Sequence, residues 1–136
     1  MTVQDYYALV EACIRELGVD PVTCRGQKEG QWDLQKGSAS VWIDVIQHEN
    51  GWIYFQCMAP VCKIPTDTSK KIEFYEEILE KNHQLFGVGL TKYKEGIYIK
   101  TIREMENIDK SEILAQINRI GNYADDLDDY FNEKYK

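Results

Sequence analysis

The sequence predicts an α+β fold, in which a twisted antiparallel sheet of about five strands carries its helices mainly on one face. Three observations predict it. Segments 41–59 and 88–102 read as β-hairpins, because apolar residues alternate on either side of a turn that contains glycine. Helical periodicity appears in three other stretches, near both ends and in the middle of the chain. The resulting order, α-β-β-β-α-β-β-α, lacks the β-α-β crossovers that build parallel sheets.

Bulk properties indicate one domain, residues 1–136, with 43% hydrophobic and 29% charged residues. The net charge of −7 argues against nucleic acid and anionic membranes as partners, since both select for basic patches. There is no stretch long and apolar enough for a transmembrane helix, and the N-terminus MTVQDYY does not read as a signal peptide. We expect a cytoplasmic protein whose four cysteines are free thiols, with no metal and no cofactor.

The first element is a helix with Thr2 as its N-cap and Asp5 three residues on, running to Leu17 with Gly18 as the stop signal. Glu11 is expected on its polar side. The apolar stripe of this helix comprises Val3, Tyr6, Tyr7, Val10, Cys13, Ile14 and Leu17. A loop or weak strand at 19–30 leads to a short strand at 31–35, and residues 36–38 turn the chain into the first hairpin.

Turn chemistry decides which residues share a face of the hairpin 41–59. A two-residue Asn50-Gly51 turn would pair Val45 with Gln56, whereas a three-residue loop, 49–51, pairs Val45 with Phe55. Only the second register collects an apolar face, made of Val41, Ile43, Val45, Ile53, Phe55 and Cys57. The opposite face then carries an aromatic, amphipathic set, the predicted partner-binding residues Trp42, Asp44, Ile46, Trp52, Tyr54, Gln56 and Met58.

Two prolines, Pro60 and Pro65, are expected to end this part of the sheet. The middle helix begins near 67–69 and ends at Phe86, before Gly87. Its apolar residues form two groups that together cover nearly half of the circumference: Ile72, Tyr75, Leu79 and Phe86, and then Phe74, Ile78 and Leu85. Such a wide face indicates either burial between the sheet and another helix or self-association, with Phe74, Ile78 and Leu85 as the predicted self-association residues.

The second hairpin, 88–102, is expected to turn through three residues, Lys94-Glu95-Gly96, so that Tyr93 pairs with Ile97 and lies on the face of Ile99. Leu90 would lie on the opposite face. The last helix starts with the capping box Asp109-x-x-Glu112. Its apolar stripe comprises Ile113, Ile117, Ile120, Ala124, Leu127 and Phe131. The cluster of Asp125, Asp126, Asp128 and Asp129 is expected to be a solvated outer face, with a docking patch for a basic partner as the alternative.

No catalytic constellation is visible, and we therefore predict that the protein is not an enzyme. Neither His48 nor His83 has a nucleophile or carboxylate at a spacing that suggests a relay. The segment 87–92, GVGLTK, lacks phosphate-loop spacing and leads from a helix into a strand, the reverse of the usual order.

Three segments carry a resemblance to a known family: WIDVIQHENGWIYFQCMAP, DTSKKIEFYEEILEKNHQLF and GVGLTKYKEGIYIKTI. Together with the capped terminal helices, they resemble the YbjN-like proteins, which are similar in fold to the small type III secretion chaperones. The resemblance covers nearly the whole chain and implies a homodimer or small oligomer with no known catalytic residues. For the secretion chaperones it also implies binding of an extended client segment.

Two functions are compatible with the sequence. The first is a non-enzymatic, chaperone-like or regulatory module that binds a protein or polypeptide client through the aromatic face and forms a homodimer. The alternative is a small-molecule sensor, in which the loop 19–30 or the last helix closes over the same face to form a pocket. A third possibility, an enzyme using Asp44 or His48, has no group that would orient either side chain. The last helix or a second subunit could also simply cover the aromatic face.

Overall fold

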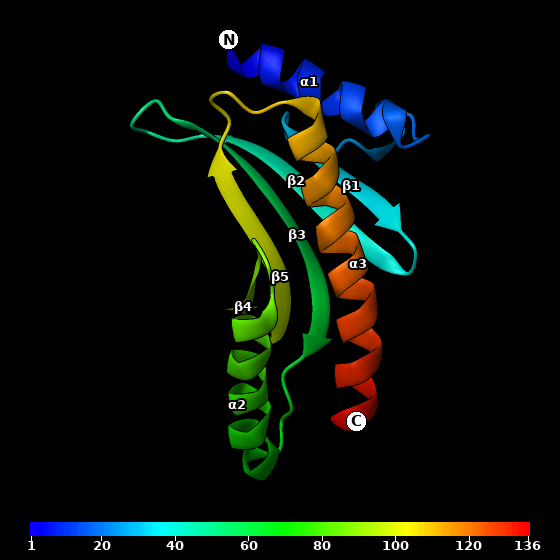
Figure 1. Ribbon diagram of the computed structural model, residues 1–136, viewed down its shortest axis with the longest axis vertical. Coiled ribbons are helices and arrows are strands. Elements are labelled where there is room, and N and C mark those ends of the chain that lie inside the picture. Colours follow the sequence, from blue (N-terminus) through cyan, green and yellow to red (C-terminus); the bar gives the residue numbers. More distant parts are fainter.

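The computed structural model describes residues 1–136 and contains the predicted order of helices and strands, with one short 3-10 helix added (Figure 1). This order and the single antiparallel sheet confirm the α+β fold class. The elements are α1 (Val3–Glu16), η1 (Pro21–Cys24), β1 (Gln31–Lys36), β2 (Ala39–Gln47), β3 (Ile53–Lys63), α2 (Thr68–Gln84), β4 (Gly89–Tyr93), β5 (Gly96–Glu104) and α3 (Lys110–Lys134).

The five strands are ordered β1-β2-β3-β5-β4, so that β1 and β4 are the edges and the long β3 is central. Burial alternates along β2 and along most of β3, as expected for a sheet with only one face packed. Helices α1 and α3 lie across the buried face, which we call the inner face, and α2 lies beside β4 at the lower end (Figure 1). We call the opposite face, which no helix covers, the outer face.

The first hairpin has the predicted register. Val45 pairs with Phe55, and the His48 N–H donates to the Trp52 carbonyl at 2.8 Å across the loop 49–51. Gly51 has a φ of 89°, the left-handed conformation that this loop requires. The apolar set of the hairpin accordingly points inward, where Val41, Ile43 and Phe55 are buried.

The second hairpin differs from its prediction by one residue. Tyr93 pairs with Gly96 rather than with Ile97, because the turn consists of Lys94 and Glu95 alone, with Lys94 at a φ of 54°. Since side chains alternate along a strand, this shift exchanges the two faces of β4. Leu90 becomes buried opposite Ile99, and Tyr93 moves to the outer face. Burial of Leu90 against the inner face is the physical reason for this register.

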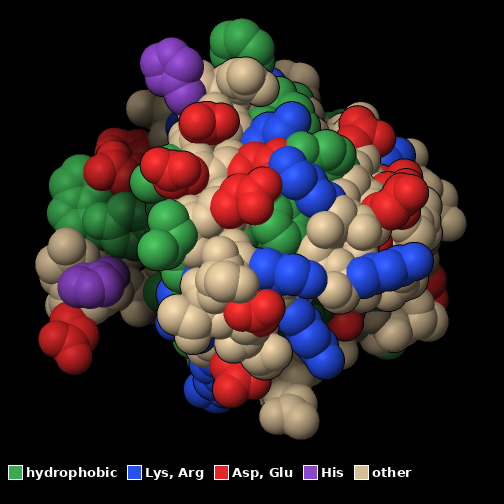
Figure 2. Space-filling view, turned by 90° about the horizontal axis from the view of Figure 1, so that it is seen from below, with side chains coloured by type: hydrophobic (Ala, Val, Ile, Leu, Met, Phe, Trp, Pro, Cys, Tyr) green, Lys and Arg blue, Asp and Glu red, His purple; other side chains and the backbone are tan.

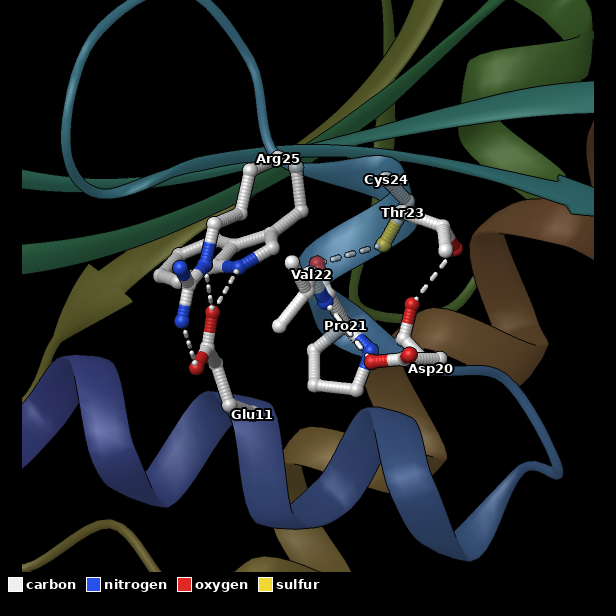
Figure 3. A network of polar contacts seen from close by, with 8 residues as sticks. Glu11, Asp20, Pro21, Val22, Thr23, Cys24 and Arg25 are labelled. Carbon is white, nitrogen blue, oxygen red and sulfur yellow. Dashed lines mark hydrogen bonds and ion pairs between the residues drawn. The ribbon is translucent and has the colours of Figure 1, made fainter.

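Both terminal helices begin with capping boxes. That of Asp109 with Glu112 was predicted as such, and that of Thr2 with Asp5 begins at the predicted N-cap. The apolar stripe predicted for α3 is buried throughout. For α1 the prediction needs one correction, because Glu11 is buried rather than on a polar side. Its carboxylate accepts two hydrogen bonds from the Arg25 guanidinium, both at 2.8 Å, and one from Trp32 Nε1 at 2.9 Å (Figure 3).

This carboxylate joins α1 to β1 and to the residue that follows η1. Hydrogen bonds from Arg25 are the main cause that lowers the pKa of Glu11 to about 2; burial opposes the shift and Trp32 adds to it. The segment 19–30, predicted to be a loop or weak strand, is therefore held against the sheet, with Arg25 also bridging to Trp32 through the backbone.

The middle helix buries the group of residues that was predicted for self-association. Phe74 and Ile78 are buried and Leu85 is partly buried, which makes the first two unavailable to a second subunit. Phe74 packs against Phe131 and Tyr135 of the α3 end, at centroid distances of 5.8 and 5.0 Å. The other group remains in solvent, with Ile72, Leu79 and Phe86 exposed by 72%, 68% and 75%.

The third strand continues past Pro60, where the sequence predicted its end. β3 reaches Lys63 and stays paired with β5, with a register shift between Pro60 and Cys62. Its pairing with β2, however, stops at Trp42 and Met58. Proline is tolerated here because the β2 side of β3 is already an edge at this point.

Candidate functional site

The outer face carries all seven residues predicted to bind a partner. They come from β2, β3 and the loop between them, and all are partly or fully exposed. Cross-strand pairs place them in rows: Met58 lies between Trp42 and Lys100, and Gln56 lies between Asp44 and Ile102. The structure thus brings the predicted set together on one surface and extends it onto β5.

An aromatic row on this face was missed by the sequence interpretation. Tyr98 of β5 lies 5.8 Å from Trp42 and 5.9 Å from Tyr93, measured between ring centroids. Tyr93 is 54% exposed, and the Lys94 ammonium lies 5.2 Å from its ring centroid. The row crosses the sheet from β2 to the edge strand β4. Only the correct register of the second hairpin would have revealed it.

Asp44 is the half-buried charge within this surface. Gln56 Nε2 approaches its carboxylate at 3.4 Å. Burial raises the pKa of Asp44, and hydrogen bonds from Gln31 and Gln56 offset part of this effect. Both neighbours are amides, and no base, nucleophile or second carboxylate is paired with Asp44. It suits a hydrogen-bond acceptor better than a catalytic acid.

The hairpin tip forms the upper end of the face. Trp52 is exposed, and a groove of about 460 Å³ runs between it and Met1, Tyr6 and Glu106. A second groove, about 440 Å³, continues from Glu106 to Tyr54 and Ile102 on the outer face. The two grooves thus lead from the sheet around the tip towards the start of α1, and they join aromatic side chains to the charged Arg103, Glu104 and Glu106.

Helix α3 does not cover the aromatic face, which answers one of the alternatives left open by the sequence. It packs on the inner face, so Trp42 and Trp52 are not core residues within one chain. The loop 19–30 borders the outer face at Gly26, beside a cavity of about 220 Å³ lined by Trp42 and Asp44, and does not close over it.

Other side chains have structural or solvent-facing roles. No group of three or more His, Cys, Asp or Glu residues is arranged to hold a metal ion. Burial raises the pKa of the Cys13 thiol to about 11 and that of Cys62 to about 12, which disfavours the nucleophilic thiolate. No helix of the protein is long and apolar enough to span a membrane. Seen from below, acidic and basic side chains intermingle over the centre of the surface with hydrophobic side chains between them, and a larger hydrophobic group lies at the left margin (Figure 2).

Solved structures share this architecture closely. A chain of the HopA1–SchA chaperone–effector complex superimposes with a TM-score of 0.66 at 9% identity, covering 91% of this chain and 93% of its own. The Yersinia pestis type III secretion chaperone SycH, in complex with a stable fragment of YscM2, gives a TM-score of 0.62 at 14% identity, covering 90% of this chain and 98% of the other. The fold is that of the type III secretion chaperones.

A chain of the ExsC–ExsE complex shares the same fold, with a TM-score of 0.68 at 8% identity and 93% of each chain covered. No protein-family model matches the sequence, and no curated protein matches it. The resemblance to the secretion chaperones is therefore confirmed at the level of the fold, and membership of the YbjN-like family stays a prediction.

Proposed function

We propose that this chain is a non-enzymatic, chaperone-like module that binds an extended segment of a polypeptide client on the outer face of its sheet. The observation that carries the proposal is the uncovered surface of aromatic and aliphatic side chains that spans four strands, with the helices packed elsewhere. Large aromatic side chains supply most of the binding energy at protein interfaces.

The solved neighbours support this function by what they contain. Two of the three are described as a chaperone bound to an effector or to a fragment of another protein. The same role here fits an apolar face that is exposed in the single chain and that a bound partner would shield from water. We place its action in the cytoplasm, where its four free cysteines would remain reduced.

Fluorescence anisotropy with labelled 13-residue peptides, selected from a random-sequence array by binding to the wild type, tests the proposal. We expect Trp42→Ser/Trp52→Ser to weaken binding at least tenfold, since both rings lie on the proposed surface. The matched control is Ile72→Ser/Leu79→Ser, which removes two exposed apolar side chains from α2 and should leave peptide affinity unchanged. Equal affinity of wild type and the tryptophan variant would contradict the proposal.

We also propose a homodimer, formed through the exposed apolar group of α2 and the neighbouring edge strand β4. Ile72 and Leu79 of α2 and Phe86, just after it, are exposed. Asn82 ties α2 to β4 through two hydrogen bonds with Leu90. A self-complementary apolar patch is typical of a twofold interface.

Light scattering measures the mass of the protein in solution and therefore its oligomeric state. The wild type is expected at about twice its 15.9 kDa mass, and Ile72→Glu/Leu79→Glu at the mass of one chain. The tryptophan variant serves as the control and should stay dimeric. A wild type that is monomeric at all concentrations would refute the dimer without affecting the client-binding face.

The small-molecule sensor stays an alternative with less support. Ligand pockets usually enclose about 300–1,000 Å³, whereas the cavity between Gly26 and Trp42 is about 220 Å³. A larger cavity, about 320 Å³, lies near Tyr7 and Arg25, and only two of its ten lining residues are hydrophobic. A thermal-shift screen of metabolites separates the two functions, because stabilisation by a metabolite would favour the sensor.

A further inference from the structure

The sheet opens at the lower end of the outer face. In an antiparallel pair of strands, every second residue pair exchanges backbone hydrogen bonds. Between β2 and β3 the hydrogen bond from His48 to Trp52 identifies these pairs, and Trp42 with Met58 is one of them. After Trp42 and Met58, the next such pair would be Ser40 with Pro60. Proline has no N–H to donate, so this pair does not close and the ladder ends there.

Beyond this point β2 and β3 are no longer paired, and α3 packs against both strands. In Figure 1 the β1–β2 turn and the lower end of β3 lie on either side of this helix. Between them is a notch of about 480 Å³. Ser40, Pro60 and Tyr98 at its margin belong to the outer face. Its other lining residues include the apolar Val61 and Ile97 of the sheet and three residues of α3, Ala124, Asp128 and Asn132.

Asp128 gives the notch a charge. It accepts a hydrogen bond from the Asn132 side chain and forms no ion pair. Its proximity to Cys62 contributes, after burial, to the raised pKa of that thiol. Lys63, the one cationic residue of the lining, is exposed and does not pair with it. Asp125, by contrast, is already engaged by Ser38.

We propose that the notch receives a lysine or arginine side chain of the client polypeptide bound to the outer face. This inference rests on the proposed function and states the chemistry of its ligand. The aliphatic stem of such a side chain packs on Val61 and Ile97, and its cationic head reaches the Asp128 carboxylate. A client with net positive charge also complements a protein with a net charge of −7.

The test uses 13-residue peptides that alternate aromatic and small polar residues and differ at one central position. That position holds arginine, lysine, citrulline or norleucine, so that citrulline is the uncharged isostere of arginine. For the wild type we expect the arginine and lysine peptides to bind about tenfold more tightly than the citrulline and norleucine peptides, the size of one charge-assisted hydrogen bond.

Asp128→Asn keeps an acceptor for Asn132 and removes the charge, and it should reduce this ratio to about one while leaving norleucine-peptide affinity unchanged. The control Asp129→Asn removes the same charge from an exposed neighbour on α3 and should retain the ratio. Equal binding of the arginine and citrulline peptides by the wild type would overturn this inference but not the proposed function. An unchanged ratio of charged-peptide to uncharged-peptide affinity in Asp128→Asn would do the same. Binding of no peptide by the wild type would overturn the proposed function, and the inference with it.

Discussion

Replacement of Glu11 by glutamine should cost this protein a measurable and pH-dependent part of its stability. The pKa of Glu11 lies near 2 against an ordinary 4.5, because Arg25 and Trp32 donate hydrogen bonds to the charged form. At about 1.4 kcal/mol per pH unit this corresponds to about 3 kcal/mol at neutral pH. The Glu11 side chain is 11% exposed but that of Arg25 is 53% exposed, so solvent screening reduces the expected loss to about 2 kcal/mol.

The sign of the pH dependence follows from the lowered pKa. A carboxyl group whose pKa falls on folding stabilises the protein fully above its unfolded-state pKa and loses this effect as the pH falls towards the folded-state value. The stability difference between wild type and Glu11→Gln should therefore be constant above about pH 6 and more than half lost by about pH 3.

Urea unfolding followed by far-UV circular dichroism at several pH values measures this difference. Glu16→Gln is the control, because Glu16 pairs with Lys110 at 3.2 Å with both side chains about half exposed, and its loss should cost less than about 0.5 kcal/mol. A Glu11→Gln variant as stable as Glu16→Gln, or a difference that does not change with pH, would refute this account of the α1–β1 connection.

Two further predictions concern the second hairpin and the contact between α2 and α3. Leu90→Ala should destabilise the protein by about 2–4 kcal/mol and Tyr93→Ala by less than about 1 kcal/mol, as measured by urea unfolding; the reverse ranking would support the three-residue turn. Glu77→Gln should lower stability by about 1–2 kcal/mol, because the mostly buried Glu77 accepts hydrogen bonds from two tyrosines and pairs with a lysine at 2.9 Å. The exposed Glu73 offers the control, and equal losses in Glu73→Gln and Glu77→Gln would contradict the prediction.

The first hairpin and the two terminal helices could be predicted because their signals are local. The loop 49–51 has a glycine where the left-handed residue must be, and the alternation of apolar residues allows one register only. The stripe of α3 repeats with helical period over its whole length. These patterns determine which side of each element faces the core, and hence the position of the seven predicted partner-binding residues.

What could not be predicted depends on contacts between distant residues. In the second hairpin Lys94, and not Gly96, adopts a positive φ. The glycine therefore predicted a turn that is one residue too long, and with it the wrong face for Tyr93. Glu11 looked like a polar-side residue, since periodicity does not reveal that a guanidinium 14 positions later will cover it. Which of the two apolar groups of α2 is buried likewise depends on where the end of α3 packs.

Nuclear magnetic resonance of the tryptophan indole N–H groups tests whether a client peptide binds on the outer face of the sheet. The protein has three tryptophans, of which Trp42 and Trp52 lie on the outer face and Trp32 is buried against Glu11 on the inner side. When a peptide that binds the protein is added, we expect the indole signals of Trp42 and Trp52 to shift and that of Trp32 to stay in place. A peptide that shifts Trp32 alone, or that binds without shifting any of the three, would contradict binding on the outer face.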